Sequence, residues 1–180
     1  MEILRVENLT KIYGVGEARV EALRQVSFSL LRGEFAAVVG VSGSGKSTLL
    51  NCIGGLDEAN QGKVFLNGRD LFAMGENERT IFRRQNIGFI FQSFHLIPEL
   101  DVEQNIIFPL LLDYKKLADE PTGNLDSQSS RDVMDLLCKA SCHYQQTVLM
   151  ITHNMNLTAA ADRVFRVSDG ELEELGGGEA

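Results

Sequence analysis

One short segment, residues 40–47, has the composition and spacing of a phosphate-binding loop, GVSGSGKS. It matches the pattern G-x-x-x-x-G-K-[ST], which binds phosphate when a buried strand precedes it and a helix follows it. Its glycines let the backbone curl so that successive N–H groups point at phosphate oxygens, and the helix N-terminus adds partial positive charge. Lys46 would reach the β- and γ-phosphates, and the Ser47 hydroxyl would bind Mg²⁺. The segment therefore predicts a nucleoside triphosphate site rather than an ordinary glycine-rich turn.

Two adjacent carboxylates, Asp119 and Glu120, form the second group that could do chemistry. A site of this kind needs an acid at the end of a neighbouring strand to hold Mg²⁺, and a base to orient the attacking water. Adjacent side chains on a strand point in different directions, so the pair could divide these tasks. Taken alone, an Asp-Glu pair is also typical of a solvated turn.

The third group is the cysteines, Cys52, Cys138 and Cys142. Their odd number, with no export signal, favours a reducing cytosol. Cys138 and Cys142 stand four positions apart beside His143, which leaves a metal site open. A free cysteine is more often a small core residue.

The elements that must position these groups are visible in the apolar pattern. Residues 35–39, FAAVV, predict a buried parallel strand that runs into the loop. A helix is expected from about Lys46 to Ile53, ended by two glycines. Further strands are expected at 2–7, 20–31, 63–66, 70–72, 87–91, 147–151 and 163–167, with a last short strand after Asp169-Gly170, and helices at 76–85, 102–112, 127–140 and 154–161. The pattern predicts one α/β domain over residues 1–180 with antiparallel strands at its N-terminus.

Composition excludes several classes of function. The net charge of −8 argues against a nucleic-acid-binding surface, which needs a basic face. The first residues, MEILRVENLT, alternate like a strand and do not resemble an export signal. The longest apolar stretches, such as 35–39 and 106–112, are too short to span a bilayer. We therefore expect a soluble chain that reaches a membrane only through a partner.

Five segments, in this order, resemble the motifs of ABC-transporter ATPases. Tyr13 in KIYG resembles the A-loop aromatic, residues 40–47 are the phosphate loop, and Phe91-Gln92 resembles the Q-loop. Residues 119–126, DEPTGNLD, resemble the Walker B end and the D-loop, and 151–154, ITHN, resemble the switch histidine. The segments TGNLD and FQSFHLIP are most similar to those of the subfamily that serves lipoprotein release and macrolide or peptide export.

The resemblance implies a fold, ligands and partners. The fold is a P-loop NTPase core with a mainly parallel sheet flanked by helices, plus an N-terminal antiparallel β subdomain. The ligands are ATP and Mg²⁺. The partners are a membrane-spanning permease subunit and a second copy of the ATP-binding domain, with no nucleic acid. The expected location is cytoplasmic, on the inner face of the cell membrane through the permease.

The resemblance also assigns roles to single residues. Tyr13 would stack on adenine, Gln92 would touch Mg²⁺ or its water, Glu120 would polarise the attacking water and His153 would contact the γ-phosphate. Asp126 would belong to the D-loop or cap the next helix. The expected catalytic residues are Glu120, His153 and Lys46. The expected nucleotide-binding residues are Tyr13, Gly40, Val41, Ser42, Gly43, Ser44, Gly45, Lys46, Ser47, Thr48 and Gln92, and the expected metal ligands are Ser47, Gln92 and Asp119.

One motif of the family, the signature LSGGQ on its helical subdomain, is missing from this sequence. In the family it supplies N–H groups to the γ-phosphate held by the opposing subunit. The residues before Asp119 read DYKKLA, and two lysines conflict with burial in a central parallel strand. We expect that several dozen residues are lost near 112–117, so that the helical subdomain is largely absent. A natural deletion, an engineered shortening and the omission of a disordered segment from the recorded chain would all leave the same sequence.

Three functions remain open at this point. The first is the ATP-binding and hydrolysing subunit of a membrane ABC transporter. The second is a nucleotide-binding module without significant hydrolysis, because the signature is missing. The third is an unrelated P-loop enzyme such as a small-molecule kinase, which the D-loop and the histidine segment argue against.

Overall fold

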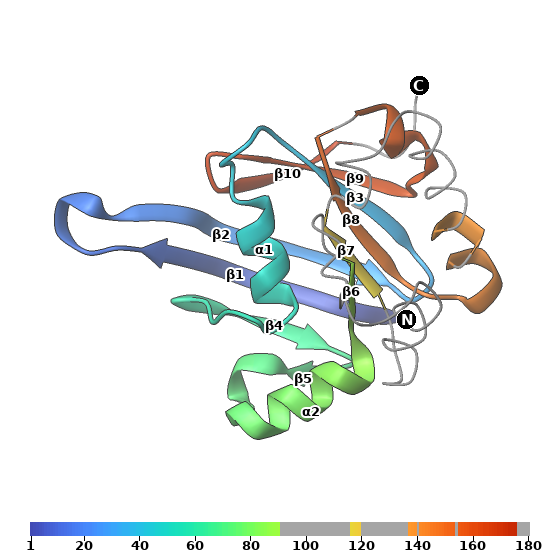
Figure 1. Ribbon diagram of the computed structural model, residues 1–180, viewed down its shortest axis with the longest axis horizontal. Coiled ribbons are helices and arrows are strands. Elements are labelled where there is room, and N and C mark those ends of the chain that lie inside the picture. Colours follow the sequence, from blue (N-terminus) through green and yellow to red (C-terminus); the bar gives the residue numbers. More distant parts are fainter. Residues whose placement is uncertain (91–115, 120–136, 140, 154, 176–180) are drawn as a thin grey trace, which may run out of the picture.

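The computed structural model describes residues 1–90, 116–119, 137–139, 141–153 and 155–175 (Figure 1). They form two sheets with a helix packed between them. The helix predicted at 102–112, the first part of the helix predicted at 127–140, and Gln92, Glu120 and Asp126 lie outside the described residues.

The first sheet is antiparallel and is built from the N-terminal part of the chain. Its strand order is β2-β1-β4-β5, with β1 Glu2–Tyr13, β2 Val20–Leu31, β4 Gln61–Leu66 and β5 Arg69–Asp70. β1 and β2 form a long hairpin, closed by the 3-10 turn η1 Gly16–Ala18, whose end protrudes from the molecule (Figure 1). β1 is longer than the predicted strand at 2–7. Its pairing with β2 shifts register around Asn8, where φ is +48°. That irregularity interrupts the alternation that sequence analysis relies on.

The second sheet is parallel except for its last strand. Its order is β10-β9-β3-β8-β7-β6, and only β9 and β10 pair antiparallel. The strands are β3 Phe35–Val39, β6 Gly88–Ile90, β7 Lys116–Asp119, β8 Val148–Thr152, β9 Arg163–Ser168 and β10 Glu171–Leu175. The predicted α/β fold with an antiparallel N-terminal subdomain is confirmed.

The continuous apolar run of β3 is explained by burial on both faces. Ala36 and Val38 pack in one core cluster, with residues of the antiparallel sheet and of helix α1 Lys46–Ile53. Phe35, Ala37 and Val39 pack in a second cluster on the opposite face. Because both faces are apolar, β3 fixes the start of the phosphate loop from two sides.

The remaining described helices are short. They are α2 Glu76–Asn86, the 3-10 helices η2 Leu71–Ala73 and η3 Met155–Ala160, and helical residues at 137–139 and 141–144. α2 and η3 lie where helices were predicted, although η3 is 3-10 and not α. Within the described part of the chain, no helix is both long enough and apolar enough to cross a bilayer.

β7 places the backbone of one of the two lysines that precede Asp119. Lys116 is the first residue of the strand and pairs with Gly88 of β6, whereas the pairing with β8 begins only at Leu117. The lysine therefore stands at the end of the strand, and its central part is Leu117-Ala118. Lys115 lies outside the described residues.

Candidate functional site

The site is built at the carboxyl edge of the parallel sheet. Val39, the last residue of β3, pairs with Thr152, the last residue of β8. Gly40 and His153 are therefore the next residues on two neighbouring strands. Asp119 ends β7 opposite Ile151 of β8, so its backbone reaches the same edge. Parallel strands that end together bring together residues far apart in sequence, here 40, 119 and 153.

The phosphate loop is held against two other strands by close backbone contacts. A Cβ on Gly45, where φ is +110°, would lie 2.3 Å from the carbonyl oxygen of Ala22 in β2. A Cβ on Gly40 would lie 2.3 Å from the carbonyl oxygen of Val167 in β9. The N–H of Gly170, in the turn between β9 and β10, donates to the carbonyl of Ser44 at 3.2 Å. Only glycine fits at positions 40 and 45, because any side chain would push the loop off its supports.

Lys46 carries the positive charge of the loop. It is buried, and its Nζ donates to the carbonyl oxygens of Gly40 at 2.9 Å and Val41 at 2.7 Å. In the part of the chain that the structure describes, no carboxylate forms an ion pair with it. Within the described residues the ammonium is held by neutral carbonyls, so an anion at this loop would meet a positively charged group.

The N-terminus of α1 adds to this charge. Gly45 is its N-cap, no side chain caps the helix there, and its first turn carries no acidic residue. The first-turn N–H groups and the helix dipole are therefore available to a phosphate. The loop, the lysine and the helix end together fit the β- and γ-phosphates of a nucleotide.

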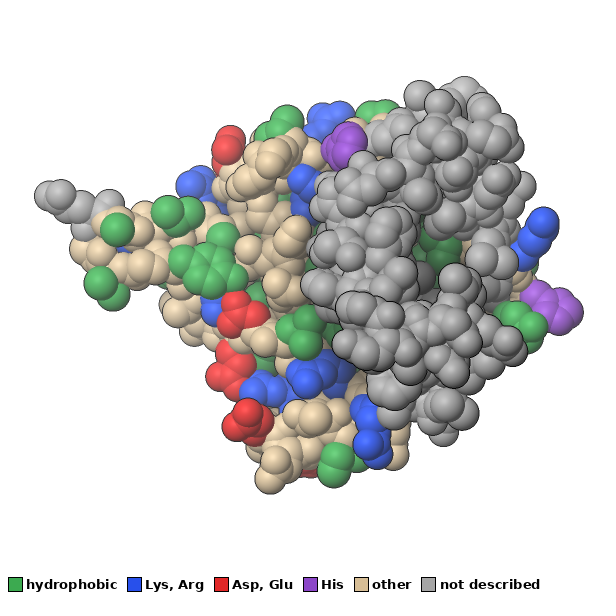
Figure 2. All heavy atoms as spheres, viewed as in Figure 1, with side chains coloured by type: hydrophobic (Ala, Val, Ile, Leu, Met, Phe, Trp, Pro, Cys, Tyr) green, Lys and Arg blue, Asp and Glu red, His purple; other side chains and the backbone are tan. Residues whose placement is uncertain are grey.

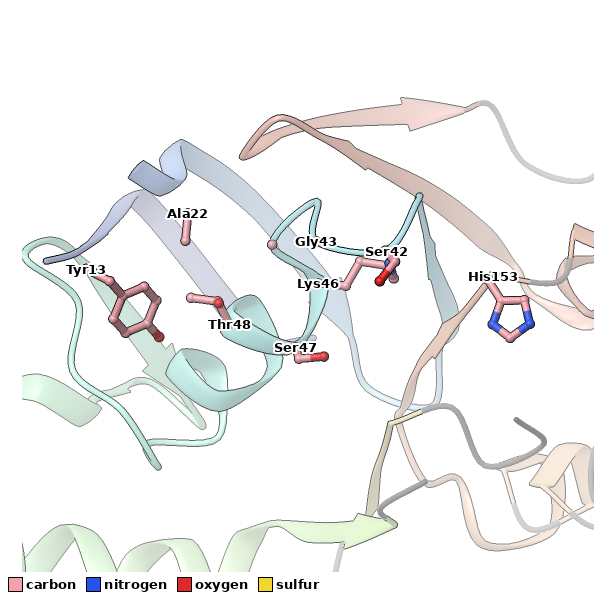
Figure 3. A pocket seen from close by; sticks show the side chains of 9 residues that line it. Tyr13, Ala22, Ser42, Gly43, Lys46, Ser47, Thr48 and His153 are labelled. Atoms are coloured by element: carbon pink, nitrogen blue, oxygen red, sulfur yellow. The ribbon is translucent and has the colours of Figure 1, made fainter. Parts of the chain in front are cut away.

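A cavity of about 480 Å³ joins the loop to residues from three other segments (Figure 3). Tyr13 lies at one end and His153 at the other, with Lys46 between them (Figure 3). The lining consists of Tyr13, Ala22, Ser42, Gly43, Gly45, Lys46, Ser47, Thr48 and His153. All of these except Ala22 were predicted from the sequence as site residues.

Three predicted residues of the loop do not line the cavity. Gly40 and Val41 contribute the carbonyls that hold Lys46. Ser44 is buried, and its hydroxyl has no hydrogen-bond partner among the described residues. The carbonyl of Ser44 accepts from the N–H of Gly170.

Tyr13 belongs to a small polar network that the sequence did not predict. Its hydroxyl donates to Oδ2 of Asp57 at 2.8 Å, and Lys11 Nζ donates to Oδ1 of the same carboxylate at 2.6 Å. Burial alone would raise the pKa of Asp57, but the hydrogen bonds from Lys11 and Tyr13 outweigh it, so this pKa lies below its usual value. Burial and the bond to Asp57 raise the pKa of Tyr13. The carboxylate is therefore charged and the phenol neutral at neutral pH.

A weak signal for this network exists in the sequence. Lys11 and Tyr13 stand two apart on one strand, which places them on one face. Nothing in the sequence points to Asp57, which follows the glycines after α1 and reaches Tyr13 only in the folded chain.

The acidic half of the site is described in part. Asp119 is placed through its backbone, and Gln92 and Glu120 lie outside the described residues. Among those that the structure does describe, no group of three or more His, Cys, Asp or Glu side chains could hold a metal ion. The predicted ligands Ser47, Gln92 and Asp119 therefore remain a prediction.

Comparison with known proteins gives one family. A family model described as ABC transporter matches residues 23–180. An uncharacterized ABC transporter ATP-binding protein of Methanocaldococcus jannaschii is 36% identical, over 96% of this chain and 99% of that protein. The lipoprotein-releasing system ATP-binding protein LolD of Coxiella burnetii is 31% identical, over 95% of each chain. The macrolide export ATP-binding/permease protein MacB of Pasteurella multocida is 32% identical, over 94% of this chain and 34% of that protein.

Comparison with solved structures supports the same family. The ATP-binding cassette MJ0796, solved as a dimer bound to ADP and Pi, superposes with a TM-score of 0.88 at 30% identity, over 98% of this chain and all of that one. The alignment with the Methanocaldococcus jannaschii relative above has 222 positions, 42 more than the 180 residues of this chain. At least that many aligned positions have no residue here.

Proposed function

This chain belongs to the ABC transporter family, and we propose that it is the ATP-binding and hydrolysing subunit of a membrane transporter. One observation carries the proposal: the phosphate loop, Tyr13 and His153 line a single cavity. The binding-only module is the less favoured reading, since relatives that match nearly the whole chain are named as ATP-binding proteins of transport systems.

The cavity gives ATP an orientation. The triphosphate would lie along the loop, where Lys46 and the N-terminus of α1 supply positive charge, and adenine would rest against Tyr13 at the far end (Figure 3). The γ-phosphate would then point towards His153. The Ser47 hydroxyl, with Gln92 and Asp119, would hold Mg²⁺, which neutralises charge on the β- and γ-phosphate oxygens.

Hydrolysis requires a water in line with the γ-phosphate. We assign the role of polarising this water to Glu120, the residue after β7, and that of contacting the γ-phosphate to His153, the residue after β8. Both follow adjacent strand ends at the edge where the loop begins. Lys46 stabilises negative charge on the phosphates as the bond breaks.

The partners follow from the family. LolD is named for lipoprotein release and MacB for macrolide export, and MacB is named as an ATP-binding and a permease protein in one. We propose that this chain likewise couples hydrolysis to a permease, on the cytoplasmic face of the membrane. We further propose that two copies act together, because the solved relative MJ0796 is a dimer.

The missing signature bears on turnover. We propose that the loss lies near residues 112–117, supported by the absence of LSGGQ and by an alignment longer than the chain. In the family, this motif closes over the γ-phosphate of the opposing subunit. The sequence keeps Glu120 and His153, which we assign to the attacking water and the γ-phosphate. It lacks the LSGGQ motif, which would contact the γ-phosphate from the opposing subunit.

Steady-state phosphate release from Mg-ATP tests the proposal. We expect slow release that falls at least tenfold in Glu120→Gln, because the amide cannot polarise the water. His153→Ala should lower release without abolishing ATP binding. Release that Glu120→Gln leaves unchanged would show that another group activates the water.

A further inference from the structure

Hydrogen bonds to two neighbouring elements hold the segment that carries Asp57 in place. The N–H groups of Leu56 and Asp57 donate to the carbonyl of Asn51 in α1, at 2.8 and 3.2 Å. On the other side, Asn60 accepts from the N–H of Ile12 at 2.7 Å. The segment after α1 is therefore tied both to the helix that follows the phosphate loop and to the strand that carries Tyr13.

Lys11 fixes the carboxylate itself. Its side chain is 12% exposed, and its Nζ donates to Asp57 Oδ1 at 2.6 Å and to the carbonyl of Glu58 at 2.7 Å. The N–H of Glu58 also donates to Asp57 Oδ1, at 2.8 Å. With Oδ1 held twice, Oδ2 faces the hydroxyl of Tyr13.

Thr48 also hydrogen-bonds the hydroxyl of Tyr13, but the ring itself is poorly held. Tyr13 is 42% exposed and ends β1 near the protruding end of the β1–β2 hairpin, and Val15 and Val20 are also exposed. Figure 2 shows hydrophobic side chains on the surface of that protruding end. Lys11 Nζ lies 4.9 Å from the ring centroid, so a cation covers part of one face. A ring so exposed loses rotamer freedom when it binds a ligand, unless something has already ordered it.

We propose that Asp57 is a positioning residue that orders the Tyr13 ring at the mouth of the cavity, ready for the nucleobase, and that Lys11 acts by holding Asp57. The proposal rests on the proposed function, because it assumes that Tyr13 meets the base. Asp57 itself is not among the residues that line the cavity. Its contribution therefore reaches the nucleotide only through the tyrosine.

A double-mutant cycle read with two ligands tests this. Affinities for Mg-ATP and for inorganic tripolyphosphate are measured by calorimetry for the unaltered chain, Asp57→Ala, Tyr13→Phe and the double variant. We expect each single change to weaken Mg-ATP by about threefold to tenfold, the scale of ordering one aromatic side chain. The double variant should be no weaker than Tyr13→Phe, because that change already removes the contact that Asp57→Ala breaks. Tripolyphosphate, which has no base, should bind all four equally.

A matched carboxylate serves as control. Asp70 also faces a lysine, with Lys63 Nζ at 3.7 Å, and accepts from the N–H of Phe72 at 3.1 Å, but it does not line the cavity. Asp70→Ala should leave the affinity for Mg-ATP unchanged. If Asp57→Ala does not fold, Tyr13→Phe with the two ligands still decides, since it removes the hydrogen bond to Asp57, together with that to Thr48, and keeps the ring.

The outcomes separate the two proposals. If Tyr13→Ala leaves Mg-ATP binding unchanged, the base does not rest on Tyr13 and both fail. If Tyr13→Ala weakens Mg-ATP and neither Asp57→Ala nor Tyr13→Phe does, only the positioning role fails. Equal weakening of Mg-ATP and tripolyphosphate in Asp57→Ala, or additive losses in the double variant, would show that Asp57 merely supports the fold.

Discussion

The ammonium of Lys46 lies 2.7 Å from the carbonyl oxygen of Val41, which stands five residues earlier in the same loop. The Lys46 side chain therefore bends back over the preceding residues of the loop, and their backbone carbonyls hold its ammonium group. An arriving phosphate offers charged oxygens in place of neutral carbonyls, and charge-assisted bonds are about twice as strong as neutral ones.

Lys46→Ala should weaken Mg-ATP binding by at least about tenfold, because it removes this charge from the phosphate site. Titration calorimetry measures the change. Lys63→Ala is the control, since Lys63 is an exposed lysine outside the cavity. This variant should bind Mg-ATP as tightly as the unaltered chain. If Lys46→Ala and the unaltered chain bound Mg-ATP with equal affinity, the loop would not be part of the ATP-binding site.

Gly45→Ala should lower the free energy of unfolding by about 2 to 4 kcal/mol, since its Cβ would both adopt a left-handed backbone and collide with a carbonyl oxygen. Gly68→Ala separates the two causes. Gly68 has φ of +77° and open space around its Cβ position, so it should lose only about 1 kcal/mol. Urea denaturation gives both values. Similar losses would mean that the contact with Ala22 relaxes without cost.

The thiol of Cys52 should be inert in the folded chain. Burial, and then the charge of Asp57, raise its pKa from 9.0 to about 12. Below pH 9.0 the thiol is protonated in both states and has no effect on stability; as the pH rises towards 12, the unfolded state ionises first and the fold loses stability. Cys142, by contrast, is exposed.

Labelling with an aromatic disulfide at about pH 8 measures this difference. The variant Cys138→Ser/Cys142→Ser keeps only Cys52, and we expect it to react no faster than the chain unfolds. The unaltered chain should show a fast phase that Cys142→Ser removes. Rapid reaction of Cys52 alone would contradict its burial on the inner face of α1.

Inserting the corresponding helical segment of a relative between Leu112 and Leu117 should raise phosphate release by up to the order of 10³-fold, since the restored motif would contact the γ-phosphate of a second copy. Glu120→Gln in the extended chain should abolish the gain. A segment of equal length in which the LSGGQ motif is scrambled serves as the control. If the scrambled segment raises the rate as much, the gain reflects restored folding and not the motif.

Sequence reasoning succeeded where the cause of a structure is local. Residues 35–39 are apolar on both faces because β3 is covered on both, and the loop and α1 follow a motif of fixed spacing. It stopped where the cause is tertiary. Ala22 lines the cavity because β2 crosses beneath Gly45, and Asp57 meets Tyr13 across 44 positions. Neither contact leaves a periodic or motif-like trace.

The hydrogen bond from Gly170 to Ser44 sets an order of events during synthesis. The strands on both sides of β3, namely β8 and β9, and the turn that supports the loop all come from residues 148–170. When the phosphate-loop sequence leaves the ribosome, none of these supports has yet been translated. A nascent chain therefore completes the supports of its phosphate loop only once residue 170 has been translated.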